Sequence, residues 1–204
     1  MQNDNLKSYL HLHVIVFIWG FTAVLGKLIS LEALDLVWYR MLFASVIMTF
    51  VVLFNKEKIR VPFNVLIGFI VSGIIIALHW LTFYQAIKVS NVSITLACLS
   101  TGAFFASILE PIFYKRKIIW YEVLFGLIVI FGLGIIFKVE TQYTNGIYLA
   151  VTSAFLSALF SVINGKYAKE YSPNVISLYE LSTGVFFLRI SLSLAASSTP
   201  AFFA

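Results

Sequence analysis

Residues 64–87 read NVLIGFIVSGIIIALHWLTFYQAI, a stretch that contains no Asp, Glu, Lys or Arg. The hydrocarbon core of a bilayer is about 30 Å thick, and a helix needs about 20 apolar residues to cross it. Apolar side chains occupy nearly every position here, whereas a strand of a membrane barrel alternates polar and apolar residues over about ten positions. The stretch therefore predicts a transmembrane helix.

Six other stretches of similar length and composition lie on either side of it. They are residues 11–29, 34–54, 92–113, 120–137, 146–164 and 174–196. The segments that join them are too short to hold a soluble domain. The fold class that we predict is an all-α membrane protein with seven transmembrane helices.

The composition of the whole chain agrees with a multi-span membrane protein. Of its 204 residues, 61% are hydrophobic and 11% are charged, whereas a soluble domain is about 45–50% apolar and about 25% charged. These values exclude a cytosolic enzyme, and they exclude intrinsic disorder, which requires low hydrophobicity and high charge. The net charge of +5 does not indicate a nucleic-acid partner, because the basic residues form short clusters between the apolar stretches.

The basic residues also predict how the helices are oriented. One side of the predicted topology carries Lys7, Lys56, Lys58, Arg60, Lys115, Arg116, Lys117, Lys166 and Lys169, and the other carries Lys27, Lys88 and Lys138. The excess of Lys and Arg marks cytoplasmic loops. We therefore expect a multi-pass protein of the cytoplasmic (inner) membrane with its N-terminus in the cytoplasm.

The sequence offers no set of side chains for catalysis or for binding a metal or cofactor. Its one cysteine, Cys98, lies inside an apolar stretch and is expected to be a buried small residue. No His-Glu-x-x-His motif occurs, and Asp4 and Asp35, the two aspartates, do not form an intramembrane pair. We expect no enzyme activity, no cofactor and no metal.

An internal repeat links the two ends of the chain. Residues 21–27, FTAVLGK, align with residues 160–166, FSVINGK, and residues 37–40, VWYR, align with 177–180, SLYE, at an offset one residue greater. Equivalent points are five spans apart, and because five is odd the second copy enters the membrane from the opposite face. Inverted repeats of this kind are typical of secondary transporters. The repeat predicts a first unit of five helices at residues 1–140 and the start of a second unit, with two helices, at residues 141–204.

Several landmarks of the chain resemble the EamA family of the drug/metabolite transporter superfamily. They are Trp19-Gly20 with Lys27, Tyr39-Arg40, Glu110-Pro111 and the glycine-rich stretch 126–136. The resemblance implies a fold of five plus five helices in inverted repeats, from which the last three helices are absent. Two positions depart from the family pattern: Thr101-Gly102 stands where many members carry a proline, and residues 114–117, YKRK, stand where they carry Gly-Glu.

Charged residues inside the spans are the first candidates for a substrate site or a gate, because a charge at bilayer depth is costly. Arg40 and Glu180 lie about six residues inside opposite ends of their spans, which separates their levels by roughly 12 Å. We therefore expect no direct ion pair between them. Arg40 either belongs to a site or extends to the outer headgroups, and Glu180 either faces a cavity, where it would be the carrier in proton-coupled transport, or is a protonated packing residue.

Other candidates are polar or aromatic residues at similar depth. His79 lies near Trp80 and Tyr84 and is either a ligand-binding residue or a hydrogen-bonded packing residue. A stripe at four-residue spacing includes Ser157 and Ser161 and either packs helices closely or lines a polar cavity. Asn164 lies where its repeat partner is an apolar leucine, an asymmetry that suits a site facing one end of a substrate.

Two charged residues near the span ends are expected to have structural roles, with a role in substrate binding as the alternative for each. Glu110 lies close in sequence to Lys115 and Arg116, so we expect an ion pair at the membrane interface. Lys27 follows Gly26 at the end of the first span, where a cation interacts favourably with a helix C-terminus. We expect it to cap its own helix.

These residues predict a secondary transporter that moves small organic metabolites, or amino-acid-like compounds, by alternating access. The substrate would lie between the repeats near the midplane of the bilayer. The expected partners are the metabolite and the lipid bilayer, together with a second copy of the chain or the helices absent after the seventh. The alternatives are a seven-helix membrane receptor or sensor, or an inactive fragment. A retinal-binding receptor is disfavoured because no lysine follows Lys169.

Overall fold

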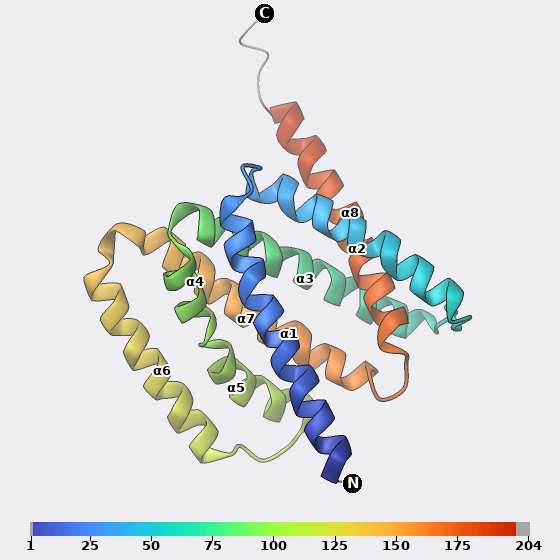
Figure 1. The fold of residues 1–204 in the computed structure, drawn as a ribbon, viewed down its shortest axis with the longest axis horizontal. Coiled ribbons are helices and arrows are strands. Elements are labelled where there is room, and N and C mark those ends of the chain that lie inside the picture. Colours follow the sequence, from blue (N-terminus) through green and yellow to red (C-terminus); the bar gives the residue numbers. More distant parts are fainter. Residues whose placement is uncertain (1, 199–204) are drawn as a thin grey trace, which may run out of the picture.

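The computed structural model describes residues 2–198, and within that range it is helical, with no strand (Figure 1). The helices are α1 (Gln2–Leu28), α2 (Ala33–Phe54), α3 (Phe63–Val89), α4 (Val92–Leu99), α5 (Gly102–Tyr114), α6 (Trp120–Val139), α7 (Thr144–Tyr167) and α8 (Pro173–Ser198). A short 3-10 helix, η1 (Thr141–Tyr143), precedes α7. The all-α fold class is confirmed.

Seven segments of the described chain are long and apolar enough to cross a membrane. They are Leu6–Leu28, Ala33–Phe54, Phe63–Val89, Val92–Tyr114, Trp120–Val139, Thr141–Tyr167 and Pro173–Ser193. Each corresponds to one predicted span, and the boundaries differ by a few residues. The number of spans is therefore confirmed.

The fourth span differs from the prediction, because it is two helices rather than one. The Ser100 hydroxyl donates to the Ala97 carbonyl at 2.6 Å, and the Thr101 hydroxyl donates to the Cys98 carbonyl at 2.7 Å. Such bonds from Ser and Thr back to the preceding turn compete with the helix ladder and bend helices. The break between α4 and α5 thus has a local chemical cause that an average of hydropathy does not reveal.

Helix α3 lies at the centre of the arrangement. It packs mainly against α7, α8 and α2, and it also touches α1 and α4. Figure 1 shows α2 and α8 crossing at one side of α3, and α6 at the opposite edge. Helix α3 therefore joins the part of the chain predicted as the first repeat to the part predicted as the second.

Glycines leave room for close packing at two of these contacts. A Cβ at Gly73 of α3 would lie 2.6 Å from the backbone oxygen of Glu180 in α8. A Cβ at Gly184 of α8 would lie 2.6 Å from the Sδ atom of Met41 in α2. Helices in lipid associate largely through such close packing of small residues. Gly73 is thus a point of close packing between α3 and α8.

Helix α6 is peripheral. It packs mainly on α5, with few contacts to α4, and Gly126 is the one buried residue of α6, which the structure describes in full. The preceding turn reverses at Lys115, whose φ of 51° and ψ of 34° place it in the left-handed region.

Two loops that were predicted to lie on the same side of the membrane are in contact. The Asn174 side chain donates from Nδ2 to Glu57 Oε1 at 2.7 Å, and the Tyr179 hydroxyl donates to the Ile59 carbonyl at 2.9 Å. These bonds join the α2–α3 loop to the start of α8. We refer to Glu57, Asn174, Ile59 and Tyr179 as the loop latch.

Candidate functional site

A chain of buried hydrogen bonds joins α3, α7 and α8. The Ser72 hydroxyl donates to Asn164 Oδ1 at 2.9 Å, and Asn164 Nδ2 donates to Glu180 Oε2 at 3.2 Å. Glu180 is 3% exposed, and its Oε1 is buried without a hydrogen-bond partner. A buried polar atom without a partner is rare and costly. The carboxyl group thus retains an unused capacity to bind a proton or a cationic group.

The local sequence explains how this chain of hydrogen bonds forms. Ser72 and Gly73 are consecutive in α3, so one turns its hydroxyl toward α7 while the other lets the backbone of α8 approach at Glu180. Two of the three members, Asn164 and Glu180, were predicted as site residues, and the structure brings them together. Ser72 was missed, although a lone serine in the apolar stretch 64–78 is a visible signal.

Arg40 forms a second group with two aromatic rings of α3. Its guanidinium carbon lies 5.4 Å from the ring centre of Trp80 and 5.2 Å from that of Tyr84. Trp80 and Tyr84 are four residues apart, so they lie on one face of the helix. A cation over an aromatic face gains about 0.5–2 kcal/mol, more when it is desolvated. The structure therefore unites Arg40, Trp80 and Tyr84, and the arginine packs on α3.

The register of α2 against α8 separates Arg40 from Glu180. The two helices run antiparallel (Figure 1), and the Ser45 and Ser182 hydroxyl oxygens lie 2.9 Å apart. In this register Arg40 is level with Phe187. Glu180 is seven positions away along α8, which at about 1.5 Å per residue is roughly 10 Å. The separation agrees with the expectation that these two residues do not form a direct pair.

His79 ties α3 to α7. Its Nδ1 atom lies 2.8 Å from both the carbonyl oxygen and the hydroxyl oxygen of Ser153. The ring also lies beside Phe83 and Phe160, with ring centres 6.2 and 5.7 Å away. These contacts are those of a hydrogen-bonded packing residue, the simpler of the two interpretations of His79.

The serine stripe of α7 changes its surroundings along the helix. Ser153 is fully buried against His79, Ser157 is half-buried and Ser161 is exposed. Among residues 2–198, no hydrogen bond joins the hydroxyl of Ser157 or Ser161 to Glu180 or Arg40. The structure thus leaves these two predicted site residues apart from both polar groups.

Lys27 caps a helix other than its own, which corrects the expected role. Its Nζ donates to the carbonyl oxygens of Ile87 at 2.9 Å and Ser90 at 3.2 Å, at the C-terminus of α3. Lys88 in turn donates to the Ile29 carbonyl, just beyond α1. A cation at a helix C-terminus satisfies carbonyls that lack an intrahelical partner. The two lysines therefore cap each other's helices.

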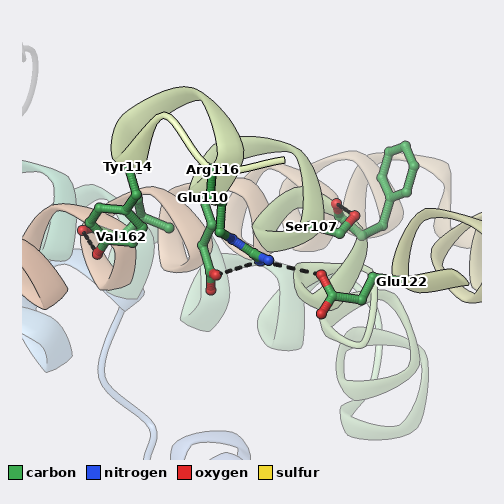
Figure 2. Close-up of polar contacts among 7 residues, drawn as sticks. Ser107, Glu110, Tyr114, Arg116, Glu122 and Val162 are labelled. Carbon is green, nitrogen blue, oxygen red and sulfur yellow. Dashed lines mark hydrogen bonds and ion pairs between the residues drawn. The ribbon is translucent and has the colours of Figure 1, made fainter. Parts of the chain in front are cut away.

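An ion-pair cluster lies where α5 turns into α6. Figure 2 shows Arg116 between two carboxylates: its Nη2 lies 2.7 Å from Glu110 Oε2 and 3.2 Å from Glu122 Oε2. The expected interfacial ion pair of Glu110 is confirmed with Arg116, and Glu122 adds a second carboxylate. Burial alone would lower the pKa of Arg116, but its hydrogen bonds and charge attraction to Glu122 and Glu110 outweigh burial and raise the pKa. We refer to these three residues as the acidic–basic triad.

Two hollows of the described chain lie away from Glu180 and Arg40. One of about 400 Å³ lies between α5 and α6 beside the acidic–basic triad. Another of about 360 Å³ lies between α4 and the end of α6. Residues 2–198 contain no group of three or more His, Cys, Asp or Glu side chains that could hold a metal ion.

The loop latch was not predicted. Hydrogen bonds from the Ser172 hydroxyl and the Asn174 amide hold the pKa of Glu57 below its usual range. Close by, the buried Phe69 ring packs against the rings of Tyr167, Tyr171 and Tyr179, whose centres lie 5.2, 5.9 and 5.8 Å away. No sequence motif marks these residues, because they come from segments more than 50 residues apart.

Seven apolar spans define the chain as an integral, multi-pass membrane protein. The model of the EamA-like transporter family matches residues 6–138, which is more than half of the chain. The chain therefore belongs to the EamA-like transporter family, a member of the drug/metabolite transporter superfamily. Comparison with curated proteins and with solved structures gave no match.

Proposed function

We propose that the chain is a secondary transporter that moves small organic metabolites or amino-acid-like compounds across the cytoplasmic membrane by alternating access. The observation that carries the proposal is the unpartnered Oε1 of Glu180, which is buried where α3 meets α7 and α8. A carboxyl group at this depth is costly, and such groups typically mark substrate or ion pathways. In this proposal Glu180 binds a proton or the cationic group of the substrate.

Arg40 supplies the complementary charge. Its Nε is also buried without a partner, and the rings of Trp80 and Tyr84 flank its guanidinium group. A solute that carries both an ammonium and a carboxylate group meets Glu180 and Arg40 in succession along the pathway rather than at once, because their levels are roughly 10 Å apart. This complementarity favours the amino-acid-like class. Of the other predicted site residues, Asn164 is proposed to line the same pathway, because its amide contacts Glu180 directly.

We propose that residues 1–140 form one repeat and that residues 141–204 begin a second, inverted one. The family match over residues 6–138 supports this division, because it ends near the proposed boundary. Met41 and Ala77 meet Gly184 between the levels of Arg40 and Glu180. Alternating access then requires α8 to move relative to α2 and α3. Helices beyond α8, or a second copy of the chain, would complete the second half.

Transport by reconstituted protein tests this function. Proteoliposomes that contain a pH-sensitive dye are given a mixture of ¹⁴C-labelled amino acids, with and without an inward proton gradient. We expect labelled uptake that the gradient stimulates, and we expect Glu180→Gln to abolish the stimulation. Glu170→Gln is the matched control, since Glu170 is an exposed loop residue.

The outcomes separate the parts of the proposal. Uptake that is equal in wild type and Glu180→Gln removes Glu180 from the coupling site. Failure to take up any labelled amino acid, by protein whose thermal unfolding shows that it is folded, contradicts the amino-acid-like class of substrate.

A further inference from the structure

A groove of small residues runs between α5 and α6. Ala103, Ala106 and Ser107 of α5 face Gly126 and Val129 of α6 across the hollow of about 400 Å³. The first three lie at spacings of three and four residues, so they share one face of their helix. The walls of the groove are apolar along most of its length, and only its loop end is polar.

The acidic–basic triad forms that polar end. The side chains of Glu110, Arg116 and Glu122 are 39%, 30% and 36% exposed, so all three are accessible from outside the bundle. Two carboxylates against one guanidinium leave a formal charge of −1. Arg116 uses its Nη2 for both carboxylates, while its Nε is buried without a partner (Figure 2). The triad therefore has excess negative charge that an external cationic group can meet.

The charged end of the groove lies where two spans meet their connecting loop, the depth at which a bilayer would place lipid headgroups. The triad lies at the junction of two membrane-spanning segments, Val92–Tyr114 and Trp120–Val139. Trp120 and Tyr121 are exposed beside it, and such aromatic residues are enriched at the membrane–water interface. Lys115 and Lys117 are exposed in the same loop. An amphiphile in the bilayer thus meets apolar walls at the depth of its acyl chain and charged groups at the depth of its headgroup.

We propose that this groove binds a phospholipid whose headgroup carries a primary ammonium, namely phosphatidylethanolamine. Its ammonium donates to Glu110 and Glu122, its phosphate accepts from the exposed Lys115 or Lys117, and one acyl chain occupies the apolar groove. The proposal is independent of the transport function, because the groove is separate from Glu180 and Arg40.

The charge and the hydrogen-bonding groups of the triad select this headgroup. Phosphatidylcholine carries a cation of the same charge, but its quaternary ammonium has no N–H to donate. Phosphatidylglycerol carries no cation to meet two carboxylates. Hydrogen bonds between charged groups are the strong ones, so losing them discriminates between lipids with identical acyl chains.

Native mass spectrometry of the purified chain tests the proposal. The protein is titrated with phosphatidylethanolamine or phosphatidylcholine of the same acyl composition. We expect about tenfold tighter binding of phosphatidylethanolamine, the effect of one charge-assisted hydrogen bond. Glu122→Gln, which removes the excess negative charge, should abolish the difference. Glu170→Gln removes an exposed carboxylate from another loop and should preserve it. Equal binding of the two lipids by wild type refutes the proposal.

A second variant keeps the test informative if Glu122→Gln does not fold. Ala106→Leu fills the apolar groove and leaves the triad intact, so it should lower binding of the lipid. A soluble headgroup analogue, phosphoethanolamine, should bind the wild type at least tenfold more weakly than the lipid. Equally tight binding of phosphoethanolamine overturns the lipid as occupant. A dimer that Ala106→Leu dissociates, with no lipid bound, overturns it in favour of a second copy of the chain.

Discussion

Replacing Gly73 with alanine tests a close backbone contact between α3 and α8. An added Cβ would lie 2.6 Å from the Glu180 backbone oxygen, 2.9 Å from Glu180 Cα and 2.9 Å from Thr183 Cβ. The first two are backbone atoms, which cannot rotate away as the end of a side chain does. Helix α8 must therefore withdraw by about 0.8 Å to restore an ordinary contact, and the hydrogen bond between Asn164 and Glu180 lengthens with it.

The size of the effect follows from two opposing terms. Overpacking of a well-packed site costs about 1–3 kcal/mol, and a clash with backbone lies at the upper end. Alanine in place of glycine inside a helix stabilises the folded state by about 1 kcal/mol. We expect a net loss of about 2 kcal/mol in the free energy of unfolding.

The matched control is Gly132→Ala in α6. A Cβ there meets nothing within 4 Å, so only the helix term applies, and we expect a gain of up to about 1 kcal/mol. Unfolding of both variants is followed by circular dichroism during titration with SDS in mixed micelles. Equal shifts in the same direction for the two variants would refute the close α3–α8 contact.

Three further predictions concern the loops. Lys27→Met removes the cap on α3 and should lower the free energy of unfolding by about 1 kcal/mol. The control Lys138→Met should change it little. SDS titration measures both variants, and equal effects would argue against the cap. Because the pKa of Glu57 is lowered in the folded chain, its stabilising effect is present above the usual pKa of a glutamate and is lost as pH falls through the lowered value. Thermal unfolding from pH 7 to pH 3 should therefore show a loss of stability that Glu57→Gln reduces, and identical pH profiles would contradict the loop latch. Single cysteines at Lys58 and Lys117, in a Cys98→Ser background, should react with an impermeant maleimide only from the cytoplasmic side; labelling from outside would reverse the proposed orientation.

The spans could be predicted because hydropathy is a local property of the sequence. Residues 64–87 are apolar on nearly every face, and the corresponding helix, α3, begins and ends within two residues of the predicted limits. The break in the fourth span could not be found in this way. It depends on hydrogen bonds of Ser100 and Thr101 to the preceding turn, and two hydroxyl groups hardly change the mean hydropathy of a long apolar segment.

The sequence predicted several residues of the candidate site, but it did not predict which of them contact one another. Depth in the span identified Arg40 and Glu180, since charge is costly wherever it enters the bilayer. The partners of Glu180 depend on which helices are neighbours, which neither periodicity nor spacing specifies. The same reason explains Lys27: a lysine at a helix end was correctly expected to act as a cap, but the sequence does not say which helix lies within its reach.

The peripheral position of α6 determines how the bundle can come apart. Local openings cost least where few buried contacts are lost, and α6 has one buried residue and packs mainly on α5. In hydrocarbon, however, a helix cannot melt, because its backbone groups would lose their partners. Thermal opening at this edge is therefore a lateral departure of an intact rod from α5. Amide exchange would not record such an event, whereas a distance probe between α5 and α6 would.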